Sequence, residues 1–234
     1  MNVYENNKNI SFLSTEIVLV DIIGFSKLTS EEQANTAVLI NGDLEFHLQI
    51  VSGQTTWTID EMIMGFVSTG DGFYVVLQPH LIGYGIILAM SLRTSLLNAS
   101  ERNKNLFAGV RVACHYGELN IFQDFSGKTN YVGPVMNECA RIVNIKDEEL
   151  PENFCLDKNI VAASVRSLKE FCKLYSWEYF KERGVTRSQK VIVTDKHNEQ
   201  HEAVLIESPR RLAFNPPKPI DYLSRLEKRR TKYS

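Results

Sequence analysis

The sequence predicts an α+β fold with a ferredoxin-like βαββαβ core, to which extra C-terminal strands and helices are added. Apolar segments with strand and helix patterns follow one another in that order along the first two thirds of the chain. A Gly-Asp-Gly turn at 70–72 lies between two short apolar runs, a pattern typical of a β-hairpin. The chain has 234 residues, of which 44% are hydrophobic, so it can bury a large core.

The first strand and helix are predicted from local patterns. Residues 16–22 are mostly Ile, Val and Leu, which indicates a strand that is buried on both faces. Gly24 interrupts this run. Ser30 and Gln33 have the spacing of a capping box, so we expect a helix to begin there and to end before Ser52.

The later elements follow from the same patterns of apolar spacing and turn residues. In the core we expect strands at 62–69 and 73–77, a buried helix at 81–97, strands at 107–115 and 117–122, and a helix at 135–145. Beyond the core we expect a helix at 165–175 and strands at 177–181, 190–194 and 203–206.

Composition divides the chain into three expected parts. Residues 1–15 form a polar N-terminal segment, and residues 16–208 form the folded domain. Residues 209–234 combine a Pro-rich linker, Asn215 to Pro219, with a basic C-terminal tail.

Charge and cysteine content exclude several classes of protein. The formal net charge of -2 disfavours a nucleic-acid partner, since duplex binding needs a basic face. No apolar run reaches the roughly 20 residues of a membrane span, and the polar N-terminus does not resemble a signal peptide. The four cysteines form no C-x-x-C pair. We therefore expect a cytoplasmic protein with no membrane partner.

Two aspartates occupy positions where carboxylates are unusual. Asp21 ends the first apolar strand, and Asp71 lies at the tip of the predicted hairpin. We expect the first strand to lie beside the strand that follows the first helix, which brings the two carboxylates together. Such a pair repels unless a cation or proton lies between them, and Mg²⁺ prefers oxygen ligands. A turn cap at Asp21 and a hairpin turn at Asp71 would also account for these two residues.

Two further segments suit a phosphate group. The loop Ile22 to Ser26 joins a strand to a helix, where backbone N–H groups can hold phosphate oxygens. Asn137 and Arg141 are four residues apart on a predicted helix, so both point to one side. A carboxamide and a guanidinium suit developing charge on a phosphate, although an ordinary exposed polar face has the same composition.

Four segments, in this order, resemble the class III nucleotidyl cyclases, the family of adenylate and guanylate cyclase catalytic domains. They are VLVDIIGFSKLT at 18–29, STGDGFYVVL at 68–77, GVRVACHYGEL at 109–119 and YVGPVMNECARI at 131–142. The resemblance extends over roughly residues 16–194.

The resemblance implies that Asp21, the carbonyl of Ile22 and Asp71 bind two Mg²⁺ or Mn²⁺ ions. It implies that Arg141 stabilises charge on the α-phosphate of a nucleoside triphosphate and that Asn137 orients the ribose. The phosphates are expected against the backbone of Ile23, Gly24, Phe25 and Ser26, with a basic residue, Lys181 or Arg183, on the triphosphate.

The family builds each site across a dimer interface, with aspartates from one subunit and the Asn/Arg helix from the other. The chain carries both sets, so the resemblance implies a homodimer with equivalent sites. His115 and Arg111 are interpreted as structural residues.

The base-reading positions depart from those of the purine cyclases. Val67 stands where a lysine or glutamate reads the purine, and Asn130 stands at the second reading position. A pocket without its polar partners loses discrimination for the purine. Trp57 and Phe66 are candidates to narrow the pocket for a smaller base, although either could be an ordinary core residue. The Asn130 carboxamide suits either pyrimidine.

These departures resemble the Pycsar pyrimidine cyclases of bacterial antiphage defence, which make cyclic CMP or cyclic UMP for a separate effector. The leading hypothesis is thus a CTP or UTP cyclase. Two alternatives stay open: an adenylate or guanylate cyclase with an unusual base pocket, and an inactive nucleotide-binding homologue.

Overall fold

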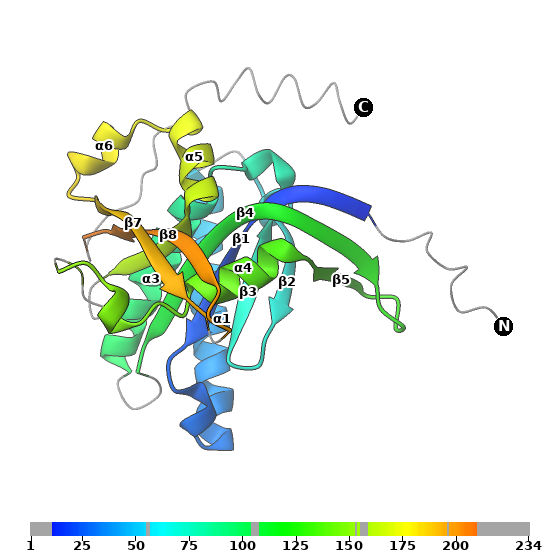
Figure 1. The fold of residues 1–234 in the computed structure, drawn as a ribbon. Coiled ribbons are helices and arrows are strands. Elements are labelled where there is room, and N and C mark those ends of the chain that lie inside the picture. The colour runs from blue at the N-terminus through cyan, green and yellow to red at the C-terminus, as the bar shows by residue number, and fades with distance from the viewer. Residues whose placement is uncertain are drawn as a thin grey trace.

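A single mixed β-sheet with helices on both faces forms the centre of the protein (Figure 1). The computed structural model describes residues 11–54, 57–103, 108–152, 154, 159–195 and 197–209. The expected Pro-rich linker and basic tail, apart from its first residue, lie outside the described residues, as does most of the expected N-terminal segment.

Within the described residues, eight strands form the sheet. They are β1 (Ser11–Ile22), β2 (Ile63–Ser68), β3 (Gly72–Leu77), β4 (Val110–Gln123), β5 (Thr129–Val132), β6 (Ile160–Ser164), β7 (Thr186–Thr194) and β8 (Gln200–Glu207). Their order is β2-β3-β1-β4-β6-β8-β7, and β5 pairs with one end of β4. The β4–β6 pair is parallel, and the other pairs are antiparallel.

The helices divide between the two faces of the sheet. They are α1 (Ser30–Gln54), α2 (Ile59–Met62), α3 (Gly85–Arg102), α4 (Pro134–Ile142), α5 (Val165–Leu174) and α6 (Trp177–Lys181), with 3₁₀ turns η2 (Phe25–Lys27), η3 (Pro79–Leu81) and η4 (Asp147–Glu149). Two hydrophobic clusters form the core. The cluster that we call the first lies between one face of the sheet and helices α1, α3 and α5. The cluster that we call the second lies between the other face and helix α4. The structure describes no helix that is both long enough and apolar enough to span a membrane.

Strand β1 explains how one run of apolar residues serves both clusters. Val18 and Val20 belong to the first cluster, whereas Ile17 and Leu19 belong to the second. Successive side chains of a strand point to opposite faces, so a strand between two helical layers must be apolar throughout. This confirms the prediction that the strand is buried on both faces.

The expected core order is confirmed, because β1, α1, β2, β3, α3 and β4 follow one another along the chain. The prediction that β1 lies beside the strand after the first helix, β2, is wrong. β1 lies between β3 and β4, while β2 is at the edge of the sheet beyond β3. β1 also begins at Ser11, earlier than expected.

Several expected elements differ in the structure. Helix α1 begins at Ser30 as predicted, but Thr29 and Glu32 form its capping interactions instead of Ser30 and Gln33. The two strands expected at 107–115 and 117–122 are one continuous strand, β4. The described residues also include two strands, β5 and β6, that the sequence did not predict.

The prediction of a strand at 177–181 is wrong, because this segment is the short helix α6. Its aromatic residues are typical of a strand by propensity. In the structure, Phe180 packs instead against Phe171 of α5, with ring centroids 5.1 Å apart. Phe180 is thus buried from a helix, and this packing on α5 is not visible in the local sequence.

Candidate active site

Asp21 lies at the end of β1, between β3 and β4. It faces Gly72 on one side and Arg111 on the other. By strand alternation its side chain shares the face of Leu19, which is the face that α4 covers. Arg111 binds it through Nη2, 2.6 Å from Oδ2, and through Nε, which donates to the same oxygen at 2.8 Å. The proposed metal ligand is thus already paired with a cation of the chain.

Asp71 lies on the exposed turn between β2 and β3. Its backbone carbonyl accepts a hydrogen bond from the N–H of Ile22 at 2.8 Å, and the Thr69 hydroxyl donates to its carboxylate at 3.3 Å. The turn approaches β1 closely, because a Cβ added at Gly72 would lie 2.1 Å from the carbonyl oxygen of Val20. This close contact fixes Asp71 next to the end of β1.

The structure therefore brings together the two aspartates that the sequence singled out. Asp21 pairs with Gly72, and Asp71 precedes Gly72 in the chain. Two carboxylates and a nearby backbone carbonyl, that of Ile22, are the oxygen donors that Mg²⁺ and Mn²⁺ accept. The donor types fit the ions that the sequence implies.

The loop after β1 has fewer free N–H groups than expected. The N–H of Ile22 donates to Asp71, and the N–H of Ile23 donates to the carbonyl of Gly109 at 3.0 Å. Ile23 therefore cannot offer its N–H to a phosphate in this conformation, which corrects the prediction for that residue.

The remainder of the loop keeps an open backbone. Gly24 has φ of 72°, a left-handed conformation that favours glycine, and it precedes the turn η2. Among the described residues, the N–H groups of Gly24, Phe25 and Ser26 have no backbone partner. Gln33 of α1 donates to the carbonyl of Phe25 at 3.2 Å, so it holds the loop in shape. The spacing of Gln33 from Ser30 indicates only a helix cap, so this contact with the loop is not evident from the sequence.

Arg141 and Asn137 lie on α4, as expected. Asn137 is exposed. Arg141 forms ion pairs with Asp195, at 3.4 Å, and with Glu199, at 3.2 Å, in the turn between β7 and β8. Neither acid is evident as a partner of Arg141 from the sequence, because both lie far from it along the chain.

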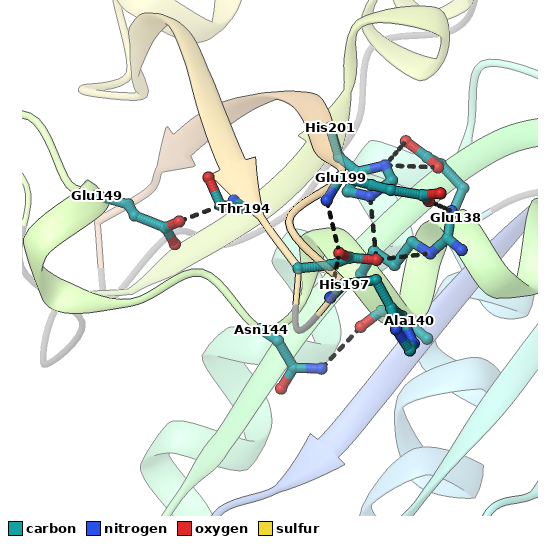
Figure 2. A network of polar contacts seen from close by, with 10 residues as sticks. Glu138, Ala140, Asn144, Glu149, Thr194, His197, Glu199 and His201 are labelled. Atoms are coloured by element: carbon teal, nitrogen blue, oxygen red, sulfur yellow. Dashed lines mark hydrogen bonds and ion pairs between the residues drawn. The ribbon is translucent and has the colours of Figure 1, made fainter.

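His201 and Glu138 extend these contacts. His201 Nδ1 lies 3.0 Å from a Glu138 oxygen, and its Nε2 lies 3.5 Å from Asp195 (Figure 2). We refer to Glu138, Arg141, Asp195, Glu199 and His201 together as the Arg141 network. Figure 2 shows His201, Glu199 and Glu138 converging at this network.

The two halves of the expected site remain separate within one subunit. No hydrogen bond or ion pair between described residues joins Asp21 or Asp71 to Asn137 or Arg141.

The two expected base-reading residues lie on strands that contact each other. Val67 of β2 pairs with Tyr74 and packs on the face that carries Asp21. Asn130 lies on β5, next to Tyr131. The Tyr131 hydroxyl donates to the carbonyl of Met64 in β2 at 2.6 Å.

The contact between β5 and β2 is tight. A Cβ added at Gly65 would lie 2.2 Å from the Tyr131 ring, so glycine is required there. The carboxamide oxygen of Asn130 accepts a hydrogen bond from the N–H of Tyr131 at 3.0 Å, which orients that side chain.

The two bulky residues expected to narrow the base pocket belong to the opposite face of the sheet. Phe66 stacks on Phe73, with ring centroids 4.7 Å apart, and Phe73 is part of the first cluster. Trp57 packs edge-to-face on Tyr84 of the same cluster. Neither residue lies on the face of Val67, so this prediction is wrong for both.

Lys181 and Arg183 lie in and just after α6. Lys181 pairs with Glu178 at 3.6 Å, and the Arg183 guanidinium lies 3.4 Å from the centre of the Tyr179 ring. In Figure 1, α6 lies beside α5 and away from the hairpin of β2 and β3. The structure therefore brings neither basic residue to the aspartates of its own subunit.

His115 is a buried residue of β4. Burial, aided by the positive charge of Arg166, lowers the pKa of His115 to about 4. The imidazole is therefore neutral at neutral pH, which agrees with its interpretation as a structural residue.

No protein-family model matches the chain, and no curated protein sequence matches it. Solved structures with a similar fold include nucleotide cyclases. A bacterial light-regulated adenylyl cyclase has a TM-score of 0.54 and 16% identity, over 97% of this chain and 60% of that one. The chain thus spans less than two thirds of that protein.

Two others match over almost their whole length. The adenylyl cyclase CyaB from P. aeruginosa has a TM-score of 0.56 and 12% identity, over 86% of this chain and 97% of that one. The guanylyl cyclase Cya2 has a TM-score of 0.52 and 13% identity, over 88% of this chain and 98% of that one. The chain has the α+β fold of the adenylyl and guanylyl cyclase catalytic domains.

Proposed function

We propose that the protein is a nucleotide cyclase that converts CTP or UTP to the 3′,5′-cyclic monophosphate and pyrophosphate. The observation that carries this proposal is the position of Asp21 and Asp71, held together at the end of β1 in a cyclase fold. Metal ions bound by these two carboxylates at the end of β1 would suit the transfer of a phosphoryl group.

Asp21, Asp71 and the carbonyl of Ile22 would hold two Mg²⁺ or Mn²⁺ ions. Such ions lower the pKa of a bound hydroxyl and neutralise phosphate charge. In the reaction, the ribose 3′-hydroxyl releases its proton to solvent water, and its oxygen forms a bond to the α-phosphorus. The bond from that phosphorus to the leaving oxygen breaks, and pyrophosphate departs with the electron pair.

Arg111 has a defined part in this proposal. Its guanidinium neutralises Asp21 when no other cation is present, and it must share or release Oδ2 when a metal ion binds. The interpretation of Arg111 as purely structural is thus too narrow: it sets the charge that an incoming ion meets.

We propose that Asn137 and Arg141 act on substrate bound to the aspartates of a second subunit. Within one chain, no hydrogen bond or ion pair among the described residues joins these two residues to Asp21 or Asp71, yet the chemistry needs both sets. A symmetric homodimer supplies both sets in each of two equivalent sites. In this arrangement Arg141 stabilises charge on the α-phosphate, and Asn137 orients the ribose.

The choice of a pyrimidine rests on Val67 and Asn130. Val67 has no polar group for a base edge, so it cannot read a purine as lysine or glutamate would. Tyr131 also holds β5 tightly against β2, which favours a small base beside these strands. A carboxamide can present both a donor and an acceptor, which suits cytosine and uracil. We further propose that the cyclic product is read by a separate effector in antiviral defence.

The test is to incubate the purified protein with Mn²⁺ and each of the four ribonucleoside triphosphates, and to identify products by mass spectrometry. We expect cyclic CMP or cyclic UMP as the main product. Asp71→Asn should abolish it, because the carboxylate is lost. Asp60→Asn removes an exposed aspartate from α2 and is the matched control, which should remain active.

The outcomes separate the proposals. A cyclic purine as main product would contradict the pyrimidine assignment but not the cyclase assignment. No product from any triphosphate, from protein shown to be folded, would indicate an inactive homologue. Activity that survives Asp71→Asn would refute the metal assignment.

A further inference from the structure

The Arg141 network contains more negative than positive charge. Glu138, Asp195 and Glu199 contribute three carboxylates, against one guanidinium and one imidazole. Even with His201 protonated, the negative charges remain in excess. Carboxylates held this close together favour the binding of a further cation.

Asp195 uses its two oxygens differently. Oδ1 accepts the N–H groups of His197, at 2.8 Å, and Glu199, at 2.9 Å, and so shapes the turn. Oδ2 faces Arg141 and His201 instead, at 3.4 and 3.5 Å. Oδ2 therefore makes only long contacts with other side chains.

His201 points an unsatisfied nitrogen at the same place. Its side chain is only 7% exposed, and Nε2 has no hydrogen-bond partner among the described residues. Its other nitrogen, Nδ1, contacts both oxygens of Glu138 at 3.0 and 3.1 Å. Nε2 makes only the long 3.5 Å contact with Asp195. A histidine that binds a metal ion usually has its other ring nitrogen on a carboxylate, as Nδ1 has here.

We propose that Asp195, Glu199 and His201 form a binding site for a divalent transition-metal ion, built from different residues than the proposed aspartate site. Their candidate ligand atoms lie within 4.8 Å of one another. The Glu199 side chain is exposed, so it can rotate to bring its carboxylate closer to the ligand atoms of Asp195 and His201. An imidazole together with carboxylates selects Zn²⁺ or a similar ion over Mg²⁺.

The ion and Arg141 compete for the same carboxylates. Arg141 Nε faces Asp195 Oδ2, and Nη1 faces Glu199 Oε2. An ion at these oxygens displaces the guanidinium, so metal binding frees Arg141 from the turn between β7 and β8. The effect of this release on catalysis rests on the proposed function, whereas the binding site itself does not.

The test measures Zn²⁺ binding without nucleotide, by competition with a chromophoric chelator. The full chain carries Asp21→Asn and Asp71→Asn, which remove the proposed aspartate site, and Cys172→Ser, which removes an exposed thiol. We expect one Zn²⁺ per chain, not displaced by Mg²⁺. This readout is independent of cyclase activity, so failure here is distinct from failure of the proposed function.

Variants of the network identify the ligands. His201→Ala should weaken Zn²⁺ binding by more than about tenfold, and Glu138→Gln by about tenfold, because Glu138 orients the imidazole. Asp195→Asn keeps the Oδ1 acceptor of the turn and should also weaken binding. His197→Ala removes an exposed histidine of the same turn and is the matched control, which should bind as tightly as the parent.

Arg141→Met tests the competition. Removing the guanidinium frees both carboxylates, so Zn²⁺ affinity should rise severalfold. Equal affinity in Arg141→Met and its parent would overturn the competition. Absence of Zn²⁺ binding, or unchanged binding in His201→Ala, would overturn the site.

Discussion

Glu16 gives a prediction whose size follows directly from the structure. This residue of β1 is completely buried, and its Oε2 accepts the N–H groups of Gly83, at 2.7 Å, and Gly85, at 2.8 Å, at the start of α3. Burial raises the pKa of Glu16 from 4.5 to about 7, although the Gly85 N–H, the Ser167 hydroxyl and the Gly83 N–H act against it.

The folded state therefore holds a proton more tightly than the unfolded state does. Stability from this group is fully present below the unfolded pKa, near 4.5, and is lost as the pH rises to about 7. At about 1.4 kcal/mol per pH unit, the loss is about 3 kcal/mol. Glu16→Gln removes the titrating group, keeps an oxygen for the two N–H groups and should remove this pH dependence.

The assay is urea unfolding of both proteins from about pH 5 to about pH 8, a range that spans most of the transition. The free energy of unfolding of the natural protein should fall relative to that of Glu16→Gln as the pH rises. Glu118→Gln, at an exposed position of β4, is the matched control and should track the natural protein. A pH-independent difference between Glu16→Gln and the natural protein would refute the reasoning.

Other predictions test the dimer and the packing beside the base-reading strands. Asp71→Ala and Arg141→Ala should each be inactive alone. A mixture of the two variants that exchanges subunits should recover about a quarter of normal activity, because half of the dimers are then mixed and each mixed dimer has one intact site of two. No recovery of activity would contradict a shared site. Gly65→Ala should lower the free energy of unfolding by about 1–3 kcal/mol, because its Cβ would meet the Tyr131 ring at 2.2 Å. Gly42→Ala, where a Cβ meets nothing within 4 Å, should instead raise it by about 0.5–1 kcal/mol through helix propensity, and a loss there would contradict this explanation.

Patterns confined to short stretches of sequence predicted the fold well. The apolar run of β1 and the Gly-Asp-Gly turn indicated the strands that hold Asp21 and Asp71, and both strands are present. Helix α4 lies at the helix predicted from apolar spacing and turn residues, and it begins at Pro134, a residue suited to the first helical position. These elements depend on their own residues, so the sequence reveals them.

Features that depend on distant residues were missed. Strand β5 has only four residues and is defined by its pairing with β4. The aromatic residues of α6 suggested a strand, because nothing local shows that Phe180 packs on α5. Likewise, the partners of Arg141 are brought to it by β7 and β8, strands that reach α4 only through the completed sheet.

The ion pair between Arg111 and Asp21 also bears on how the chain folds. Its two residues are directly opposite in the β1–β4 register but far apart in sequence, and such long-range pairings form slowly. A slip of one residue between these strands would turn Asp21 toward the helices on the other face and bury an unpaired carboxylate. The ion pair therefore makes folding intermediates with a shifted β1–β4 register less stable. Until β1 and β4 are correctly aligned, the proposed aspartate site for metal ions is not formed.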